Sequence, residues 1–212
     1  MTILNDIVKN TKAKLVEKKA AVSLDEIKLQ LSRLDLPKGK FKASLAGKAE
    51  AVIAEIKKAS PSAGIISENF DPIQKAREYE DFGAAALSIL TEEDFFLGSN
   101  QYLKDVKAIT SLPILRKDFM VDEYQIYEAK LIGADCILLI ASILSDIEIT
   151  DFVALAEVLE LDYLIEVHDA EELQRVEHFN NALIGVNNSC LLYTSDAADD
   201  TPCVDLGGRR II

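Results

Sequence analysis

A carboxylate and an ammonium group stand together at the end of an apolar run, in the segment "AVIAEIKKASPSAG" (51–64). Glu55 and Lys57 lie two residues apart, and on a strand that spacing points both side chains to the same face. A carboxylate in this position can keep a lysine oriented for proton transfer. An ion pair that only stabilises the strand end is the structural alternative, and these residues alone leave both interpretations open.

A second lysine ends another apolar run. Lys117 in "PILRKDF" follows the apolar residues 113–115 and precedes Phe119. Apolar surroundings disfavour the charged form of a lysine, which suits the residue to proton donation or carbonyl chemistry. The structural alternative is a surface lysine whose aliphatic stem lies along apolar groups.

Polar and aromatic groups follow three more runs. Glu166 closes "DYLIE", and Asn187 closes "LIGVN". The amide can orient a substrate hydroxyl or carboxylate, although a turn-forming asparagine fits equally. Phe95 and Phe96 in "TEEDFFLGS" can wall an aromatic substrate or pack on the fold. His168, just past Glu166, reads as a loop residue rather than a base.

The elements that position these residues alternate between strands and helices. Apolar runs predict six strands, at 51–57, 85–91, 112–119, 136–142, 162–167 and 182–188. Apolar residues three and four apart, after an Asp or Ser in several cases, predict helices at 71–84, 98–111, 121–134, 145–161 and 169–180. This alternation predicts parallel strands. Two further helices, at 3–21 and 23–34, are expected to cap one end of the fold.

A (β/α)₈ TIM barrel fits this alternation better than an open doubly wound sheet. Barrel enzymes carry their chemistry at the carboxyl ends of several strands, which is where the charged and polar groups fall here. The glycine-rich phosphate turn that an open sheet often shows after its first strand is missing from the sequence. We therefore predict an α/β chain with about six of the eight barrel strands at 46–188 and an N-terminal helical extension at 1–45.

Composition excludes several function classes. The 212 residues are 49% hydrophobic and 28% charged, which allows one substantial core and indicates a single soluble domain. No run is long and apolar enough for a membrane span or a secretory signal, so the expected location is the cytoplasm. The net charge of -13 argues against a nucleic-acid partner, but a few focused positive groups can still bind a small anion. Cys136, Cys190 and Cys203 match neither a disulfide framework nor a zinc site.

The quoted motifs carry a family resemblance. The sequence resembles indole-3-glycerol phosphate synthase, the TIM-barrel enzyme of tryptophan biosynthesis, over residues 1–188. The matching segments, in the family's order and at its separations, are "EIKKASPSAG", "SILTEEDFFLGS", "LPILRKDFMVDEYQIYEAKLIGAD", "LIEVHD" and "IGVNN". The resemblance implies a carboxy-lyase that closes the ring of 1-(2-carboxyphenylamino)-1-deoxyribulose 5-phosphate, with loss of carbon dioxide and water. No metal or organic cofactor is expected.

Residue roles also follow from the resemblance. Lys117 matches the general acid that protonates the substrate carbonyl, and Lys57 the lysine at the substrate's carboxylate and phosphate end. Glu166 matches the acid/base group of the later dehydration. The implied holding residues are Glu55 and Asn187 for the substrate and its partners, Ser60 on the phosphate side, and Phe96 beside the anthranilate ring.

The resemblance ends after Asn188, where the chain continues as "SCLLYTSDAADDTPCVDLGGRRII". This stretch predicts no alternating strand and no helix. "CLLYTS" can be encoded by a DNA run that looks like the transposase-end adapter of sequencing libraries, so we interpret residues 189–212 as a non-native tail. We expect the first and sixth strands to be unpaired edges, the fragment to self-associate, and these 212 residues to show little synthase activity, whereas the intact enzyme is expected to be a monomer.

Other readings stay open on the residues alone. Another phosphate-binding barrel is possible, such as a phosphoribosylanthranilate isomerase or a Schiff-base aldolase. The isomerase needs an Asp and Cys pair that the sequence does not place, and borohydride trapping at Lys117 would indicate the aldolase. A noncatalytic fragment is the alternative outside enzymes. Binding of a reduced substrate analogue without turnover would identify it.

Overall fold

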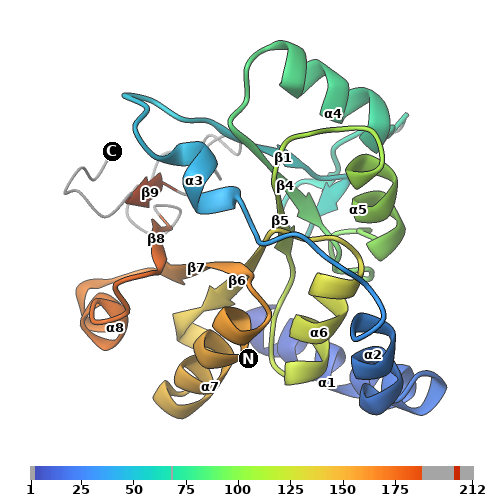
Figure 1. Ribbon diagram of the computed structural model, residues 1–212, viewed down its shortest axis with the longest axis vertical. Helices are drawn as coiled ribbons and strands as arrows, with labels where there is room; N and C mark the ends of the chain where they lie inside the picture. The colour runs from blue at the N-terminus through green and yellow to red at the C-terminus, as the bar shows by residue number, and fades with distance from the viewer. Residues whose placement is uncertain (1–2, 68, 188–202, 206–212) are drawn as a thin grey trace.

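A parallel sheet forms the centre of the computed structural model, which describes residues 3–67, 69–187 and 203–205. Its strands, in spatial order, are β1 (Ile53–Ile56), β4 (Ala86–Leu90), β5 (Ile114–Lys117), β6 (Cys136–Ile140), β7 (Asp162–Val167), β8 (Leu183–Val186) and β9 (Cys203–Asp205). The first six are parallel and follow one another in chain order (Figure 1). The six predicted strands are therefore confirmed, each within the predicted bounds.

Helices follow the strands, as the alternation predicts. These are α4 (Pro72–Asp81), α5 (Asn100–Lys107), α6 (Glu123–Leu131), α7 (Asp146–Val158) and α8 (Ala170–Val176), with a 3₁₀ turn, η1 (Ala141–Ile143), after β6. Three helices precede the first strand: α1 (Ile3–Ala21), α2 (Leu24–Leu31) and α3 (Phe41–Leu45). The side chains of Asp71, Ser99, Asp122, Ser145 and Asp169 each accept a backbone N–H of the helix that they precede. These N-caps are the Asp and Ser signals of the sequence.

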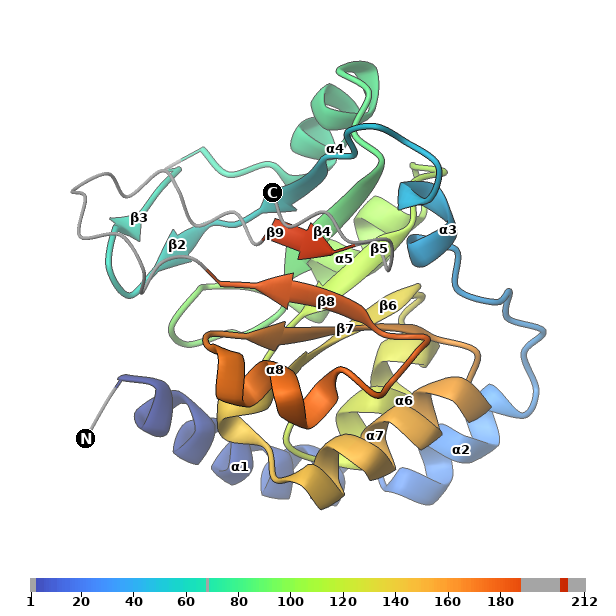
Figure 2. The same ribbon diagram turned by 90° about the vertical axis from the view of Figure 1, so that its left-hand side faces the viewer.

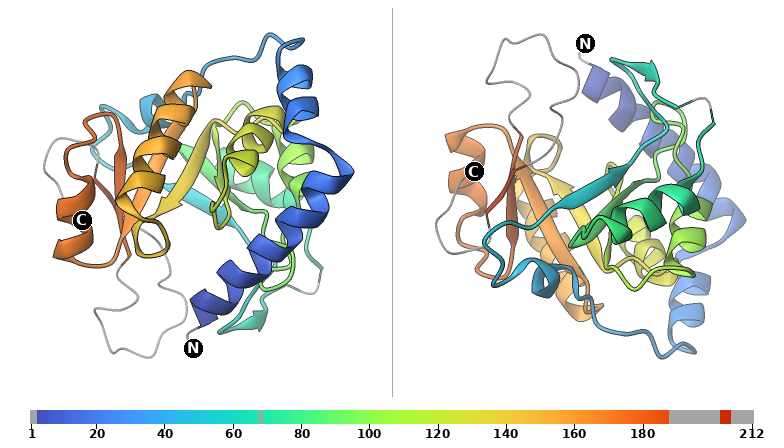
Figure 3. Two further views of the ribbon diagram at one scale, coloured as in Figure 1. Left: turned by 90° about the horizontal axis from the view of Figure 1, so that it is seen from below. Right: turned by 90° about the horizontal axis from the view of Figure 1, so that it is seen from above.

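The sheet curls like part of a barrel, with α4 to α8 on its outer face (Figure 3). One core fills the space between the strands and these helices. A second core lies inside the curl and includes Leu115, Leu138, Leu164 and Leu183. Apolar residues therefore cover both faces of the strands, which explains why the strands read as near-continuous hydrophobic runs. This architecture is that of an incomplete (β/α)₈ barrel in the described residues.

The N-terminal segment meets both ends of the strands. Phe41 and Leu45 of α3 belong to the inner core, and the backbone N–H of Lys42 donates to the carboxylate of Asp162 at 2.9 Å, where β7 begins. Figure 2 shows α3 at the end where the strands start. Residues of α1 reach the opposite end, at the carboxyl ends of the strands. Helix α2 packs on the outside of α6, through a cluster that includes Ile27 and Tyr124.

Two features differ from the sequence expectation. Strand β9 falls in the stretch 189–212, for which no strand was expected, and it pairs antiparallel with β8, with Ile184 opposite Asp205. β8, which was expected to be an unpaired edge, is therefore paired on both sides in the described part of the chain. The unpaired backbone N–H and C=O groups of an edge strand can pair with another extended segment. The rest of that stretch lies outside the described residues. Helix α3 was also not predicted, because the sequence reads there as a loop.

A small hairpin follows β1. It consists of β2 (Ala59–Ser60) and β3 (Gly64–Ile65), paired antiparallel. Gly64 has φ +66°, which a residue with a side chain adopts only with strain. Through this hairpin, the segment "ASPSAG" (59–64) reverses direction just after the carboxyl end of β1. Among the residues described, none of the helices has the length and apolarity that a bilayer crossing requires.

Candidate active site

A cavity of about 320 Å³ lies at the carboxyl ends of the parallel strands. All seven site residues named from the sequence line it: Glu55, Lys57, Ser60, Phe96, Lys117, Glu166 and Asn187. They come from β1, the β2–β3 hairpin, the loop after β4, β5, β7 and the end of β8. The predicted convergence at one end of the sheet is therefore found in the structure, while the catalytic role of each residue stays a prediction.

Glu55 sits between the two lysines. The Lys57 Nζ lies 2.7 Å from Glu55 Oε1, and the Lys117 Nζ lies 2.8 Å from Glu55 Oε2. Glu55 and Lys57 thus share a face, as their spacing predicts. Burial alone would raise the pKa of Glu55, but the charges and hydrogen bonds of Lys117 and Lys57 outweigh burial and hold that pKa below its ordinary value.

The contact with Glu55 also changes the expected surroundings of Lys117. The sequence suggested an ammonium against apolar walls, which would disfavour its charge. A carboxylate at 2.8 Å instead favours the charged form. The Lys117 ammonium thus faces a carboxylate rather than apolar groups alone, with 22% of its side chain exposed.

A second carboxyl faces the cavity from β7. Glu166 is buried, and its Oε1 accepts a hydrogen bond of 3.0 Å from the Asn187 Nδ2 at the end of β8. His168 Nε2 lies 3.6 Å from the same oxygen. The other side of the His168 ring faces Glu172 of α8, with Nδ1 3.2 Å from Glu172 Oε2. Asn187 therefore orients Glu166 rather than forming a turn on its own.

His168 is a cavity residue that the sequence reasoning set aside as part of a loop. The only signal was its position two residues after Glu166, which on a strand places both side chains on one face. Its partner Glu172 lies four residues further on, in the first turn of the following helix, and that spacing was a local signal for the contact.

The hairpin contributes hydroxyl groups to the chamber. Ser60 Oγ accepts the backbone N–H of Ala63 at 3.1 Å and lies 3.3 Å from Ser62 Oγ. Both serines line the cavity. Hydroxyl groups in a tight turn suit an anionic oxygen.

The remaining wall is apolar. The rings of Phe96 and Phe119 have centroids 5.9 Å apart, a distance typical of interacting aromatic pairs. Further apolar lining comes from the strands and from the first turns of α1: Leu90, Leu138, Ile140, Ile3, Leu4 and Ile7. The sequence reasoning missed the α1 residues, although their spacing of three and four residues marks an apolar helix face.

Arg116 forms a buried polar cluster next to Lys117. Its guanidinium donates to Thr91 Oγ1 at 3.1 Å, to Asp118 Oδ2 at 3.0 Å and to Glu128 Oε2 at 2.7 Å. Neighbouring residues of a strand point to opposite faces, so Arg116 must lie between sheet and helices if Lys117 faces the cavity. The alternation could have predicted this face, and Asp118 lies only two residues away, but Thr91 after β4 and Glu128 of α6 are partners that could not be read locally.

The donor groups do not resemble a metal centre. In the ranges 3–67, 69–187 and 203–205, His, Cys, Asp and Glu form no group of three or more that could hold a metal ion. Cys136 is buried inside the curl, and burial raises the pKa of its thiol well above the ordinary value. This cysteine is therefore an inert core residue rather than a nucleophile.

Taken together, the chamber combines two ammonium groups, a carboxyl held by an amide, hydroxyl-bearing turns and an aromatic wall. Such groups can donate a proton to a carbonyl oxygen, remove a proton elsewhere on the same molecule, and bind an anionic ligand with an aromatic part. The polar groups of this chamber thus suit acid–base chemistry on a small anionic compound.

Known proteins resemble this chain over most of its length. A family model described as indole-3-glycerol phosphate synthase matches residues 4–193. The indole-3-glycerol phosphate synthase of Clostridium acetobutylicum is 50% identical over 186 residues, covering 88% of this chain and 71% of that protein. The enzyme of the same description from Alkaliphilus metalliredigens is 44% identical over 94% of this chain and 76% of that protein. The one from Acidithiobacillus ferrooxidans is 46% identical over 88% and 72%.

Proposed function

Because the chain belongs to the indole-3-glycerol phosphate synthase family, we propose that the cavity at the carboxyl ends of the strands is its active site. The function of this chain is that of the family, a carboxy-lyase reaction in tryptophan biosynthesis. The substrate is phosphorylated 1-(2-carboxyphenylamino)-1-deoxyribulose. Its ring carbon attacks its own ketone, and carbon dioxide and then water leave.

Lys117 is the general acid in this proposal. As the ring carbon attacks, the ketone oxygen gains negative charge, and an ammonium at that oxygen stabilises the charge and transfers its proton. The position of Lys117 supports this role, because its ammonium enters the chamber from β5 and is held by Glu55 at 2.8 Å.

Lys57 binds the carboxylate and phosphate end of the substrate. A fixed cation near both anions holds the open chain bent, so that ring carbon and ketone meet, which is a contribution of orientation. The contact of 2.7 Å with Glu55 supports this role, since the carboxylate fixes the direction of the lysine before substrate arrives.

Glu166 serves in the dehydration. Loss of water needs a proton for the departing hydroxyl and a base for a ring proton, and a carboxyl can alternate between the two. The hydrogen bond from Asn187 at 3.0 Å supports this assignment, because it fixes one carboxyl oxygen and leaves the other for the substrate.

Ser60 and Phe96 bind the two ends of the substrate. We assign Ser60 and its turn to the phosphate side and Phe96, backed by Phe119, to the anthranilate ring. Both residues line the same cavity as the lysines, which supports a single extended binding mode.

The observation that carries the proposal is the pair of lysines on one carboxylate. To test it in an intact homologue, the equivalent of Lys117→Ala should lower turnover by about 10²–10⁴-fold, the range of a lost general acid, while affinity for a reduced, unreactive substrate analogue changes little. The matched control is Lys104→Ala on α5, an exposed lysine. Near-normal turnover of the Lys117 variant, with an unchanged circular dichroism spectrum, would refute the role.

Association and location are finer points of the same proposal. We propose that this chain self-associates through the free side of β1, which within the described residues is paired with β4 alone. The reason is that the unpaired edge of a parallel sheet can pair with a strand of another chain.

We also propose a cytoplasmic location, which the biosynthetic role supports and cell fractionation would check.

A further inference from the structure

The loop between β4 and α5, residues 91–98, is built around the side chain of Glu92. This carboxylate is buried and accepts three backbone N–H groups. Glu92 Oε1 accepts from Asp94 at 3.1 Å, and Glu92 Oε2 accepts from Phe95 at 2.7 Å and from Phe96 at 3.0 Å. One side chain therefore fixes the backbone of three consecutive residues, including the one that carries the proposed aromatic wall.

The ends of the loop are also closed on each other. The backbone N–H of Gly98 donates to the carbonyl oxygen of Glu92 at 2.7 Å. A Cβ on Gly98 would lie 2.5 Å from the Leu90 carbonyl oxygen and 2.7 Å from that of Glu92. The close approach of these backbone segments requires a glycine at position 98. The closed loop ends bring Phe96 within reach of the Glu92 carboxylate, which then fixes its backbone.

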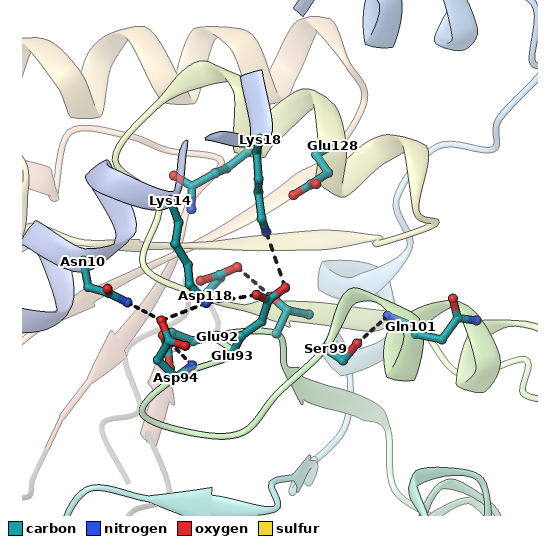
Figure 4. A network of polar contacts seen from close by, with 12 residues as sticks. Asn10, Lys14, Lys18, Glu92, Glu93, Asp94, Ser99, Gln101, Asp118 and Glu128 are labelled. Atoms are coloured by element: carbon teal, nitrogen blue, oxygen red, sulfur yellow. Dashed lines mark hydrogen bonds and ion pairs between the residues drawn. The ribbon is translucent and has the colours of Figure 1, made fainter. Parts of the chain in front are cut away.

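Helix α1 holds the outer side of the same loop (Figure 4). The Lys14 Nζ lies 2.7 Å from Asp94 Oδ2 and 3.1 Å from Glu93 Oε2, and the Lys18 Nζ lies 3.6 Å from Glu93 Oε1. Asn10 donates from Nδ2 to Asp94 Oδ2. These contacts lie on the helix that also brings Ile3, Leu4 and Ile7 to the cavity.

We propose that Glu92 is a positioning residue that sets the place of Phe96, and that the clamp of Asn10, Lys14 and Lys18 on Glu93 and Asp94 secures this loop against α1. Together they determine the affinity for the aromatic part of the substrate. This inference rests on the proposed role of Phe96. Neither Glu92 nor the clamp residues line the cavity, so they act through the residues that do.

The chemistry of the carboxylate explains why an amide of the same shape cannot replace it. Both oxygens of Glu92 face backbone N–H groups, so each must be an acceptor. A glutamine has one acceptor oxygen and one NH₂ donor, and in either orientation the NH₂ faces an N–H group. A buried N–H without an acceptor is costly, so the loop must shift, and Phe96 shifts with it.

The test is Glu92→Gln in the full chain. Calorimetry should show about tenfold weaker binding of the reduced substrate analogue, which corresponds to one lost hydrogen bond at about 1.4 kcal/mol. The same analogue without its arylamino group, 1-deoxyribitol 5-phosphate, should lose less than about twofold in affinity. In an intact homologue that carries the equivalent substitution, turnover should follow the same split, with KM raised and kcat within about twofold. The isosteric control is Glu171→Gln, an exposed glutamate of α8.

Equal weakening of both ligands, or of neither, would overturn the inference. If Glu92→Gln fails to fold, the double variant Lys14→Ala, Lys18→Ala removes the clamp from partly exposed positions, and it should also weaken the aryl-bearing analogue selectively, with Lys9→Ala as control on the same helix. Phe96→Ala separates the two proposals. An unchanged affinity in Phe96→Ala refutes the role of Phe96 itself, whereas a weakened one beside a normal Glu92→Gln refutes only the inference.

Discussion

At the scale of single residues, the arrangement of Glu55 decides what the two lysines can do. Each oxygen of this carboxylate meets one ammonium group, at 2.7 and 2.8 Å. One anion holds both ammonium groups and points them into the cavity. Its negative charge offsets part of the repulsion between the two positive charges. Removing the anion would leave two cations a short distance apart without a counter-charge.

The first prediction concerns Glu55→Gln. We expect turnover, measured in an intact homologue that carries the equivalent substitution, to fall about 10²-fold, because an amide neither orients two ammonium groups nor favours their charged forms. Steady-state kinetics, with the variant Glu50→Gln at an exposed site as control, would measure it. A variant that keeps wild-type turnover would show that the lysines are oriented by other groups.

The same substitution should alter the stability at low pH. The pKa of Glu55 is lowered in the folded chain, despite burial that would raise it, because Lys117 and Lys57 favour the ionised form. Its stabilising contribution is therefore complete above the ordinary carboxyl pKa and is lost as the pH falls through the lowered value. Urea unfolding between pH 7 and pH 3 should show a smaller acid-side loss in Glu55→Gln than in the parent chain. Identical slopes would contradict this.

Residue-level prediction from the sequence succeeded where one strand's own alternation decided the outcome. The shared face of Glu55 and Lys57 follows from a spacing of two, and the structure places both in the cavity. Arg116 was missed, because its partner Glu128 comes from the helix that follows the strand. His168 was set aside although its partner Glu172 lies only four residues further on. Alternation gives the face of a side chain but not which neighbour will reach it.

At the scale of elements, the tight closure of the loop 91–98 gives a test of backbone geometry. In Gly98→Ala, the new Cβ would meet two carbonyl oxygens at 2.7 Å or less, and backbone cannot move aside as a side chain end can. We expect a loss of about 1–3 kcal/mol in the free energy of unfolding, together with weaker binding of the substrate analogue. Urea denaturation and calorimetry would measure the two effects.

Gly83→Ala is the matched control for Gly98→Ala. Gly83 follows α4 with φ +84°, and a Cβ there would have open space. Gly83→Ala should lower the free energy of unfolding by about 1 kcal/mol, because a residue with a side chain disfavours the left-handed backbone conformation. It should not change the affinity for the substrate analogue. If both variants lose the same stability and bind the analogue normally, the closure of the loop does not position the cavity wall.

Elements with strong periodicity were predicted well, and short ones were not. The six parallel strands and the helices between them carry hydrophobic patterns and capping side chains that act locally. Helix α3 has only five residues, too few for a periodic pattern, and it forms because Phe41 and Leu45 are buried in the inner core. Strand β9 likewise depends on pairing with β8 rather than on its own composition.

At the scale of the whole molecule, the N-terminal segment encloses the inner core from two sides. Helix α3 lies where the strands begin, and α1 lines the cavity where they end. Both belong to the first 45 residues, which the sequence assigned to a helical extension whose two predicted helices were expected to cap one end. The segment therefore contributes to the fold as well as to the site.

The free side of β1 leads to a prediction about association. Val52, just before β1, is 63% exposed, and β1 is paired on one side within the described residues. We expect light scattering after size exclusion to give a mass above the monomer's 23.4 kDa. Val52→Lys should reduce that mass, because a charge beside an open edge opposes strand pairing.

The control for this edge is Val158→Lys on α7, which also replaces an exposed valine, 78% exposed, but lies away from β1. It should leave the measured mass unchanged. A parent chain that elutes and scatters as a monomer at all concentrations would contradict the proposed association through β1.

The single anion shared by Lys57 and Lys117 has a consequence for product release. Glu55 alone supplies one negative charge for two ammonium groups. In the proposed arrangement, the substrate carries a benzoate and a phosphate, and the benzoate provides a further negative charge close to the lysines. Decarboxylation removes that benzoate charge. The newly formed indole is left attached by its phosphate and by ring stacking alone, so the chemistry itself lowers the enzyme's affinity for what it has made.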